Sequence, residues 1–148
     1  MKNRTQDPKF CVSIAAPNTS KLKSSVNSAF SSGANFVEIR LDSIDSFSID
    51  SIEQLSNLHK NKLILTFRSK HQGGFSNISE PDRVKILIQL LDLKHSMKDV
   101  ESDTFNRNSS LFKNEKNLIV SWHNFKSTPS TKSLSTMIKK ISKKLTTP

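Results

Sequence analysis

The sequence is short of the features that would cross-link the chain, export it or anchor it in a membrane. Its single cysteine, Cys11, excludes an internal disulfide framework and a four-cysteine zinc site, and it is typical of a reducing, cytosolic compartment. No apolar run approaches the ~18 residues of a membrane span, and the opening residues lack the apolar stretch of a secretory signal. We therefore expect a cytoplasmic protein with no membrane partner.

Apolar and charged residues are both present in modest amounts. Hydrophobic residues make up 34% of the chain and charged residues 24%, which is lean but still typical of a globular protein. A chain of 148 residues suits a single domain, and no linker-like stretch divides it. We expect one domain over residues 1–148, although a complete β/α barrel needs ~250 residues.

The net charge of +10 comes from 23 basic and 13 acidic residues. The lysines are scattered, and the one dense group, Lys139, Lys140, Lys143 and Lys144, lies on an expected helix as a solvated face. A nucleic-acid site needs a basic stripe and an aromatic platform, and the sequence has neither. We expect no nucleic-acid partner, while the positive field favours an anionic small-molecule substrate.

Apolar runs of strand length alternate with segments of helical periodicity. The expected strands are 9–16, 35–42, 62–69, a weaker 97–101, and 117–125. The expected helices are 19–32, 50–59, 79–93, a short one within 103–114, and 131–144. Such alternation implies parallel strands joined by helical crossovers. We expect an α/β fold of the (β/α)8 TIM-barrel type, incomplete after about five β/α units, so that the barrel does not close.

Polar side chains gather near the C-terminal ends of four expected strands. Because strand residues alternate sides, residues at i and i+2 share a side. The side chains in question are Ser13, Glu38 and Arg40, Thr66 and Arg68, and Ser121 and His123. Burying a charge is costly unless it is paired, and barrel active sites lie at this face. The pattern indicates a functional site.

Each of these residues has a plainer alternative. Glu38 and Arg40 could simply pair with one another, Arg68 could be a surface charge at a strand end, and His123 could be an ordinary loop histidine.

Two further features carry weak signals. Gly73-Gly74 could be only a flexible turn. Asp99 and Glu101 have a spacing of i, i+2 with no histidine nearby, which is a poor metal signal. We expect no metal.

Four segments together carry a family resemblance. They are NFVEIRLD (35–42), ILTFRSKHQGG (64–74), DVE (99–101) and IVSWHNFKSTP (119–129), in this order. The chain resembles type I 3-dehydroquinate dehydratase, and SWHNFKSTP is the most specific match. The resemblance runs from Lys9 to about Lys144, which is roughly the first five-eighths of that family's barrel.

The resemblance implies a carbon-oxygen lyase that converts 3-dehydroquinate to 3-dehydroshikimate and water. This is a step of the shikimate pathway, which leads through chorismate to the aromatic amino acids. It implies no metal and no organic cofactor, and a homodimer. In the family, a lysine forms a Schiff base with the substrate ketone and so acidifies the neighbouring proton. A histidine moves that proton and returns one to the leaving hydroxyl. By motif, this histidine is His123.

The resemblance also assigns the other site residues. It implies that the substrate is bound by Ser13, Glu38, Ile39, Arg40 and Arg68. Where the family commonly has an acidic residue beside the histidine, this sequence has Gln72. A glutamine can orient an imidazole by hydrogen bonding, but it cannot stabilise the imidazolium by charge.

The family's lysine would follow the last expected helix, and the chain ends at Pro148. Lys98 and Lys126 are poor substitutes, because Lys98 is out of phase with Glu101 and Lys126 lies in a loop. We expect this chain to lack the Schiff-base lysine and to be inactive as it stands. The alternative is a non-catalytic remnant or a small anion-binding protein.

Overall fold

The structure is a computed structural model that describes residues 7–112 and 114–146. Its strands are β1 (Cys11–Ile14), β2 (Phe36–Arg40), β3 (Leu63–Thr66), β4 (Ser96–Glu101) and β5 (Leu118–Ser121). Its helices are α1 (Thr19–Ser31), α2 (Ile49–Leu58), α3 (Glu80–Leu91), α4 (Ser102–Arg107), α5 (Ser109–Phe112) and α6 (Thr131–Thr146). Two short 3-10 turns, η1 (Leu41–Ser43) and η2 (Lys70–Gln72), follow β2 and β3. The expected elements are confirmed, except that the short helix expected within 103–114 is two short helices, α4 and α5, that meet at Asn108; residue 113 lies outside the described residues.

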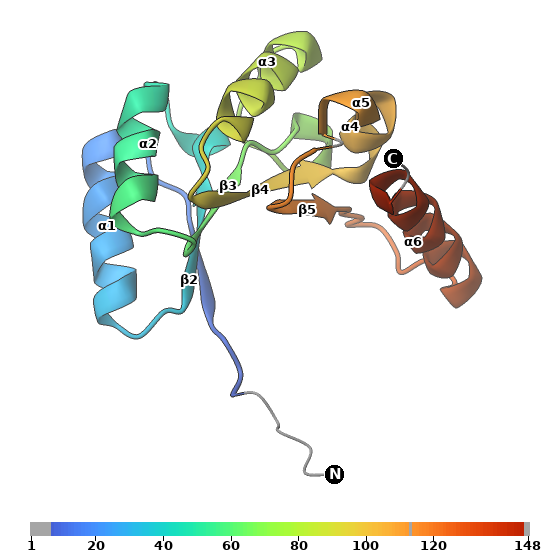
Figure 1. The fold of residues 1–148 in the computed structure, drawn as a ribbon, viewed down its shortest axis with the longest axis horizontal. Helices are drawn as coiled ribbons and strands as arrows, with labels where there is room; N and C mark the ends of the chain where they lie inside the picture. Colours follow the sequence, from blue (N-terminus) through green and yellow to red (C-terminus); the bar gives the residue numbers. More distant parts are fainter. Residues whose placement is uncertain (1–6, 113, 147–148) are drawn as a thin grey trace.

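The strands form one sheet in the order β1-β2-β3-β4-β5, and every neighbouring pair is parallel. This confirms the α/β fold with an incomplete barrel, because β1 and β5 each have a neighbour on one side only. Figure 1 shows α1 and α2 side by side at one end of the molecule and α6 at the other. Parallel neighbours require a crossover, and the intervening helices supply it.

Polar side chains set the starts of the helices. Asn18 accepts a hydrogen bond from the N–H of Lys21 at the start of α1, and Ser79 does the same for Asp82 at the start of α3. Such caps satisfy backbone N–H groups that have no partner within the helix. None of the helices among the residues described is long and apolar enough to cross a membrane.

The two faces of the sheet differ in composition. On the face that packs against the helices, most buried strand residues are apolar, namely Val37, Ile39, Leu63, Leu65 and Val100, and Ser96 and Lys98 of β4 are the polar exceptions. They pack with apolar helix residues that include Leu22, Val26, Ile52, Leu55, Leu87 and Leu90. We call this the outer face and the opposite one the inner face. Because residues alternate along a strand, Glu38 and Asp99 lie on the inner face, where Ser13 of β1 is exposed.

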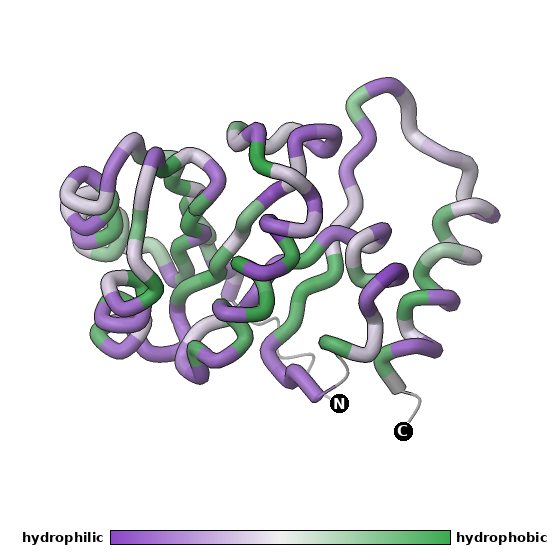
Figure 2. The backbone as a smooth tube through the Cα atoms, turned by 90° about the horizontal axis from the view of Figure 1, so that it is seen from above, coloured by the Kyte–Doolittle hydropathy of each residue, from purple (hydrophilic) through white to green (hydrophobic). Residues whose placement is uncertain are grey.

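Helix α6 is the least buried of the long helices. Of its apolar stripe only Ile141 packs against the core, while Ile138 is 60% exposed. Figure 2 shows α6 apart from the other helices, at the end of a long connecting loop. A hydrogen bond from Lys144 Nζ to the carbonyl of Asn106 (2.9 Å) joins it to α4. The sequence predicts that α6 is amphipathic, but it does not predict which elements α6 packs against.

Candidate functional site

Four side chains form what we call the inner cluster: Glu38 of β2, Thr66 of β3, Arg68 two residues beyond the end of β3, and Asp99 of β4. The register places Thr66 between Arg40 and Asp99 on neighbouring strands. Thr66 Oγ1 donates to Glu38 Oε1 at 2.8 Å. Arg68 Nη2 lies 3.5 Å from Glu38 Oε1 and 3.8 Å from Asp99 Oδ2. The expected group of charges at the strand ends therefore exists, with Arg68 between two carboxylates.

The hydrogen-bonding capacity of the inner cluster is not fully used. Both ion pairs of Arg68 are long, and its buried Nε has no hydrogen-bond partner among the residues described. Burial raises the pKa of Asp99 from 3.8 to about 6, although Arg68 opposes the shift. Buried polar groups normally find partners. The partly exposed guanidinium of Arg68, held only by long ion pairs beside a weakly paired carboxylate, is therefore suited to a polar ligand.

Arg40 makes a different set of contacts. Its Nε and Nη2 donate to the two carboxylate oxygens of Asp42 at 3.0 and 2.8 Å, and Nη2 also donates to the carbonyl of Gly73 at 3.2 Å. The alternative in which Arg40 simply pairs with Glu38 is thus wrong. Asp42 also accepts from the N–H groups of Phe75 and Arg68. Arg40 and Asp42 hold the loop that follows β3 against β2.

The contacts of Asp42 determine its ionisation. Burial works to raise the pKa of Asp42, but the hydrogen bonds from Arg40, Phe75 and Arg68 outweigh it, and the pKa lies below the ordinary 3.8. A carboxylate that accepts several hydrogen bonds is stabilised in its charged form. Asp42 is therefore ionised whenever the protein is folded near neutral pH.

The two glycines of this loop have specific structural roles. Gly73 has a φ of 86°, a conformation that favours glycine. A Cβ atom on Gly74 would lie 2.1 Å from the carbonyl oxygen of Arg68. The pair is therefore required by a close approach of two backbone segments, and it is more than a flexible turn. This approach places Gln72, the residue just before the pair, next to β5.

His123 lies two residues beyond the end of β5, where Gln72 holds it. The Oε1 atom of Gln72 accepts from the backbone N–H of His123 at 3.1 Å and lies 3.2 Å from its Nδ1. Burial lowers the pKa of His123, and the positive charge of Arg68 lowers it further. A neutral imidazole is the form that accepts a proton. His123 is therefore near enough to Arg68 for that charge to affect its ionisation.

A cavity of about 730 Å³ opens beside His123. It lies between η2, α4 and α6, and residues that line it include Gln72, Trp122, His123, Lys132 and Lys140. The two lysines add positive charge to its rim, which favours an anion.

The two other residues predicted to bind the substrate, Ser13 and Ile39, lie in different environments. Ser13 is exposed on β1, in register with Glu38. Ile39 is fully buried in the hydrophobic core on the outer face, so its side chain is out of reach of a ligand on the inner face.

Lys98 and Lys126 are poor candidates for the nucleophile in the structure as well. Lys98 lies on the outer face, 1% exposed, with its Nζ 3.5 Å from Glu115. Burial lowers the pKa of Lys98, although Glu115 opposes this. Lys126 is exposed in the loop after β5. Lys98 points away from the inner cluster because of strand alternation.

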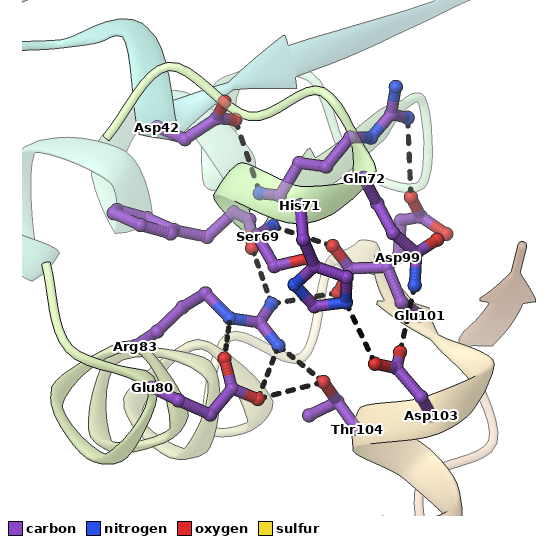
Figure 3. Close-up of polar contacts among 12 residues, drawn as sticks. Asp42, Ser69, His71, Gln72, Glu80, Arg83, Asp99, Glu101, Asp103 and Thr104 are labelled. Carbon is purple, nitrogen blue, oxygen red and sulfur yellow. Dashed lines mark hydrogen bonds and ion pairs between the residues drawn. The ribbon is translucent and has the colours of Figure 1, made fainter. Parts of the chain in front are cut away.

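Sequence reasoning missed a second group of charges, which we call the outer cluster: Glu80, Arg83, Glu101 and Thr104. Arg83 Nη1 donates to Glu101 at 2.7 Å and to the carbonyl of Phe67 at 2.8 Å, while Nε donates to Glu80 at 2.8 Å. Its Nη2 donates to Thr104 and Glu80 (Figure 3). The only signal in the sequence was the Glu80–Arg83 spacing of i, i+3 on a helix.

The outer cluster also explains the acidic pair of β4. Glu101 accepts from Arg83 and from the N–H of Ser69 (2.6 Å), so both carboxylate oxygens are engaged. Asp99 belongs to the inner cluster instead. Within residues 7–112 and 114–146, no group of three or more His, Cys, Asp or Glu side chains could hold a metal ion.

Comparisons with known proteins identify the family of the chain. The family model for type I 3-dehydroquinase matches residues 10–145. The 3-dehydroquinate dehydratase of Pyrococcus abyssi is 30% identical over 112 residues, which are 73% of this chain and 50% of that protein. The enzyme of Methanothermobacter thermautotrophicus is 29% identical over 134 residues, 85% of this chain and 57% of that protein. The chain thus spans about half the length of the curated relatives it matches.

Solved structures support the fold. The crystal structure of type I 3-dehydroquinate dehydratase from Clostridium difficile matches with a TM-score of 0.76 at 19% identity, over 93% of this chain and 59% of that one. The enzyme from Aquifex aeolicus gives 0.72 at 23% identity, over 93% and 63%.

Proposed function

Because the chain belongs to the type I 3-dehydroquinase family, we propose that it contributes to the dehydration of 3-dehydroquinate to 3-dehydroshikimate in the shikimate pathway. The observation that supports this most is the position of His123. It is held by Gln72 at the end of β5, and Arg68 of the inner cluster is near enough to lower its pKa.

The proposed chemistry assigns a task to each group. His123 takes the proton from the carbon next to the substrate ketone and later gives one to the hydroxyl that leaves. Its lowered pKa keeps the ring neutral at pH 7 and ready for the first step. The partly exposed guanidinium of Arg68 and the carboxylate of Glu38 bind substrate oxygens and hydroxyls.

We further propose that this chain does not itself supply the Schiff-base lysine. Lys98 is buried on the opposite face of β4, beside Glu115, and Lys126 is an exposed loop residue. An amine nucleophile must reach the substrate carbonyl from the same side of the sheet as the base. On this proposal the chain binds substrate and positions the base, while the covalent step needs a lysine from elsewhere.

The first test is a titration of the isotope-labelled chain with 3-dehydroquinate, followed by NMR. We expect shifts of the His123 ring and Arg68 side-chain signals, and a loss of affinity of roughly 10-fold or more in Arg68→Gln, since hydrogen bonds to charged groups are lost. Arg107→Gln is the matched control, because Arg107 is 57% exposed and lies on α4. Absence of any perturbation at these residues contradicts the proposed binding site.

The second test is reduction with borohydride in the presence of 3-dehydroquinate, followed by mass spectrometry. We expect no covalent adduct on this chain. An adduct mapped to any lysine of the chain, including Lys132 and Lys140 of the cavity beside His123, would show that the chain supplies its own nucleophile.

A further inference from the structure

Asp103 on α4 is linked to His123 through Gln72. Its Oδ1 accepts from Gln72 Nε2 at 2.8 Å, and the other end of the same amide contacts His123. Figure 3 shows the side chains of His71 and Gln72 converging on Asp103. Gln72 is 5% exposed, whereas Asp103 is 34% exposed, so the link is buried at the glutamine and open to the cavity at Asp103.

The chemistry of an amide makes this arrangement directional. Gln72 offers an acceptor at one end and two donors at the other, whereas an ionised carboxylate only accepts. Only the amino end of Gln72 can therefore face Asp103, and its oxygen must face His123. The backbone N–H of His123, which only donates, is satisfied in the same orientation.

The orientation of the amide decides which ring nitrogen of His123 carries the proton. With an amide oxygen 3.2 Å from Nδ1, the neutral ring is stabilised as the Nδ1–H form, and Nε2 keeps its lone pair. A reversed amide would donate to Nδ1 and favour the Nε2–H form, which has no free Nε2 to accept a proton.

We propose that Asp103 is a positioning residue that fixes the Gln72 amide and so holds His123 in the Nδ1–H tautomer, with Nε2 free as the base. The inference rests on the proposed role of His123 and adds a residue of α4 to that site. Asp103 meets two other groups through its second oxygen: His71 Nε2 at 2.9 Å and Arg107 Nη2 at 3.3 Å. Neither occupies the oxygen that Gln72 uses.

The tautomer of His123 is measured on the labelled chain by long-range ¹⁵N–¹H correlation at a pH about two units above the ordinary imidazole pKa of ~6.5. We expect the Nδ1–H form alone in the unmodified chain. Asp103→Ala should raise the ratio of Nε2–H to Nδ1–H by roughly 10-fold or more, because one hydrogen bond to a charged group is lost.

Two matched variants separate this effect from a general loss of structure. Asp103→Asn keeps an accepting oxygen for Gln72 and should restore the Nδ1–H form. His71→Ala removes a neighbour that contacts only the second oxygen and should leave the tautomer unchanged.

Three results would overturn the proposal: a large Nε2–H population in the unmodified chain, an unchanged tautomer in Asp103→Ala, or an equal loss in Asp103→Ala and Asp103→Asn. The first needs no variant and so does not depend on the folding of Asp103→Ala. Because the readout requires no substrate, it fails or succeeds separately from the titration with 3-dehydroquinate.

Discussion

The inner and outer clusters lie at the same end of the sheet, are built from the same residue types, and differ in how fully they are paired. In the outer cluster, every nitrogen of the Arg83 guanidinium donates a hydrogen bond, and the Arg83–Glu101 pair is 2% exposed on both sides. In the inner cluster, Arg68 makes only long ion pairs and its Nε has no described partner.

This difference indicates that the outer cluster is structural and that the inner cluster is suited to binding a ligand. A fully paired guanidinium has no donor left for a ligand, so Arg83 is suited to fastening α3 and α4 to the ends of β3 and β4. An incompletely paired one is held in place with bonding capacity to spare, as Arg68 is. Ionisation follows the same division, because the hydrogen bond from Arg83 lowers the pKa of Glu80 in the outer cluster while burial raises the pKa of Asp99 in the inner cluster to about 6.

The largest effect is expected from removing Arg83. Arg83→Ala leaves the buried carboxylate of Glu101 without its partner, and breaking one side of a buried pair costs about 3–5 kcal/mol. Urea unfolding measures the loss, and a variant found only in the insoluble fraction is the extreme form of the same result.

Arg107→Ala is the control for this variant. Arg107 also contacts Glu80 but is 57% exposed, and exposed pairs contribute about 0–1 kcal/mol. Equal losses in the two arginine variants would contradict the division into a structural and a functional cluster.

A smaller loss is expected for Asp42→Asn. The charged carboxylate accepts from Arg40, Phe75 and Arg68, and replacing it should cost about 2–3 kcal/mol, the scale of hydrogen bonds to a charged group. Because the folded-state pKa of Asp42 lies below 3.8, its contribution is present above the unfolded-state pKa and is lost as the pH falls through the folded-state value. Urea unfolding from pH 7 down to 3 should show the two proteins converging only below about pH 4. A constant difference over this range would contradict the assignment.

Asp99→Asn is expected to raise the free energy of unfolding, whereas Asp42→Asn lowers it. A carboxyl whose pKa is raised from 3.8 to about 6 contributes stability at low pH that is lost as the pH rises through the folded-state value. Removing its charge should stabilise the chain by about 1–2 kcal/mol at pH 8, with less gain below pH 4. The charges of Glu38, Arg68 and Glu101 also affect the pKa of Asp99. A variant that is less stable than the original at pH 8 would show that Asp99 is as fully paired as Asp42.

The smallest change in stability is expected for Arg68→Gln. Its ion pairs are 3.5 and 3.8 Å long, against 2.7 Å for Arg83–Glu101, so the free energy of unfolding should fall by about 1 kcal/mol, well below the loss from a closely paired buried arginine, while 3-dehydroquinate binding falls. A loss of stability as large as that of Arg83→Ala, measured in the same urea series, would mean that Arg68 is structural.

Local patterns predicted the elements, because apolar spacing reports which face of a strand or helix is buried. The i, i+2 rule placed Glu38 and Arg40 on one side of β2, and it placed Lys98 opposite Glu101. The same rule did not reveal that Arg40 binds Asp42, since a side chain of that length reaches several partners. Nor did it separate α4 from α5, which meet at Asn108 within one polar stretch.

The sequence by itself determined a parallel β/α arrangement, the face on which polar side chains gather, and the motif that singles out His123. Each depends on periodicity or on residues close together in the chain. The tertiary structure alone decided that Arg83 is saturated and Arg68 is not, and that Asp103 reaches His123 through Gln72, 31 and 51 residues away from its two partners. Pairing between distant residues depends on how the strands and helices pack. Side-chain hydrogen bonds between such residues follow no periodic pattern that could be recognised in the sequence.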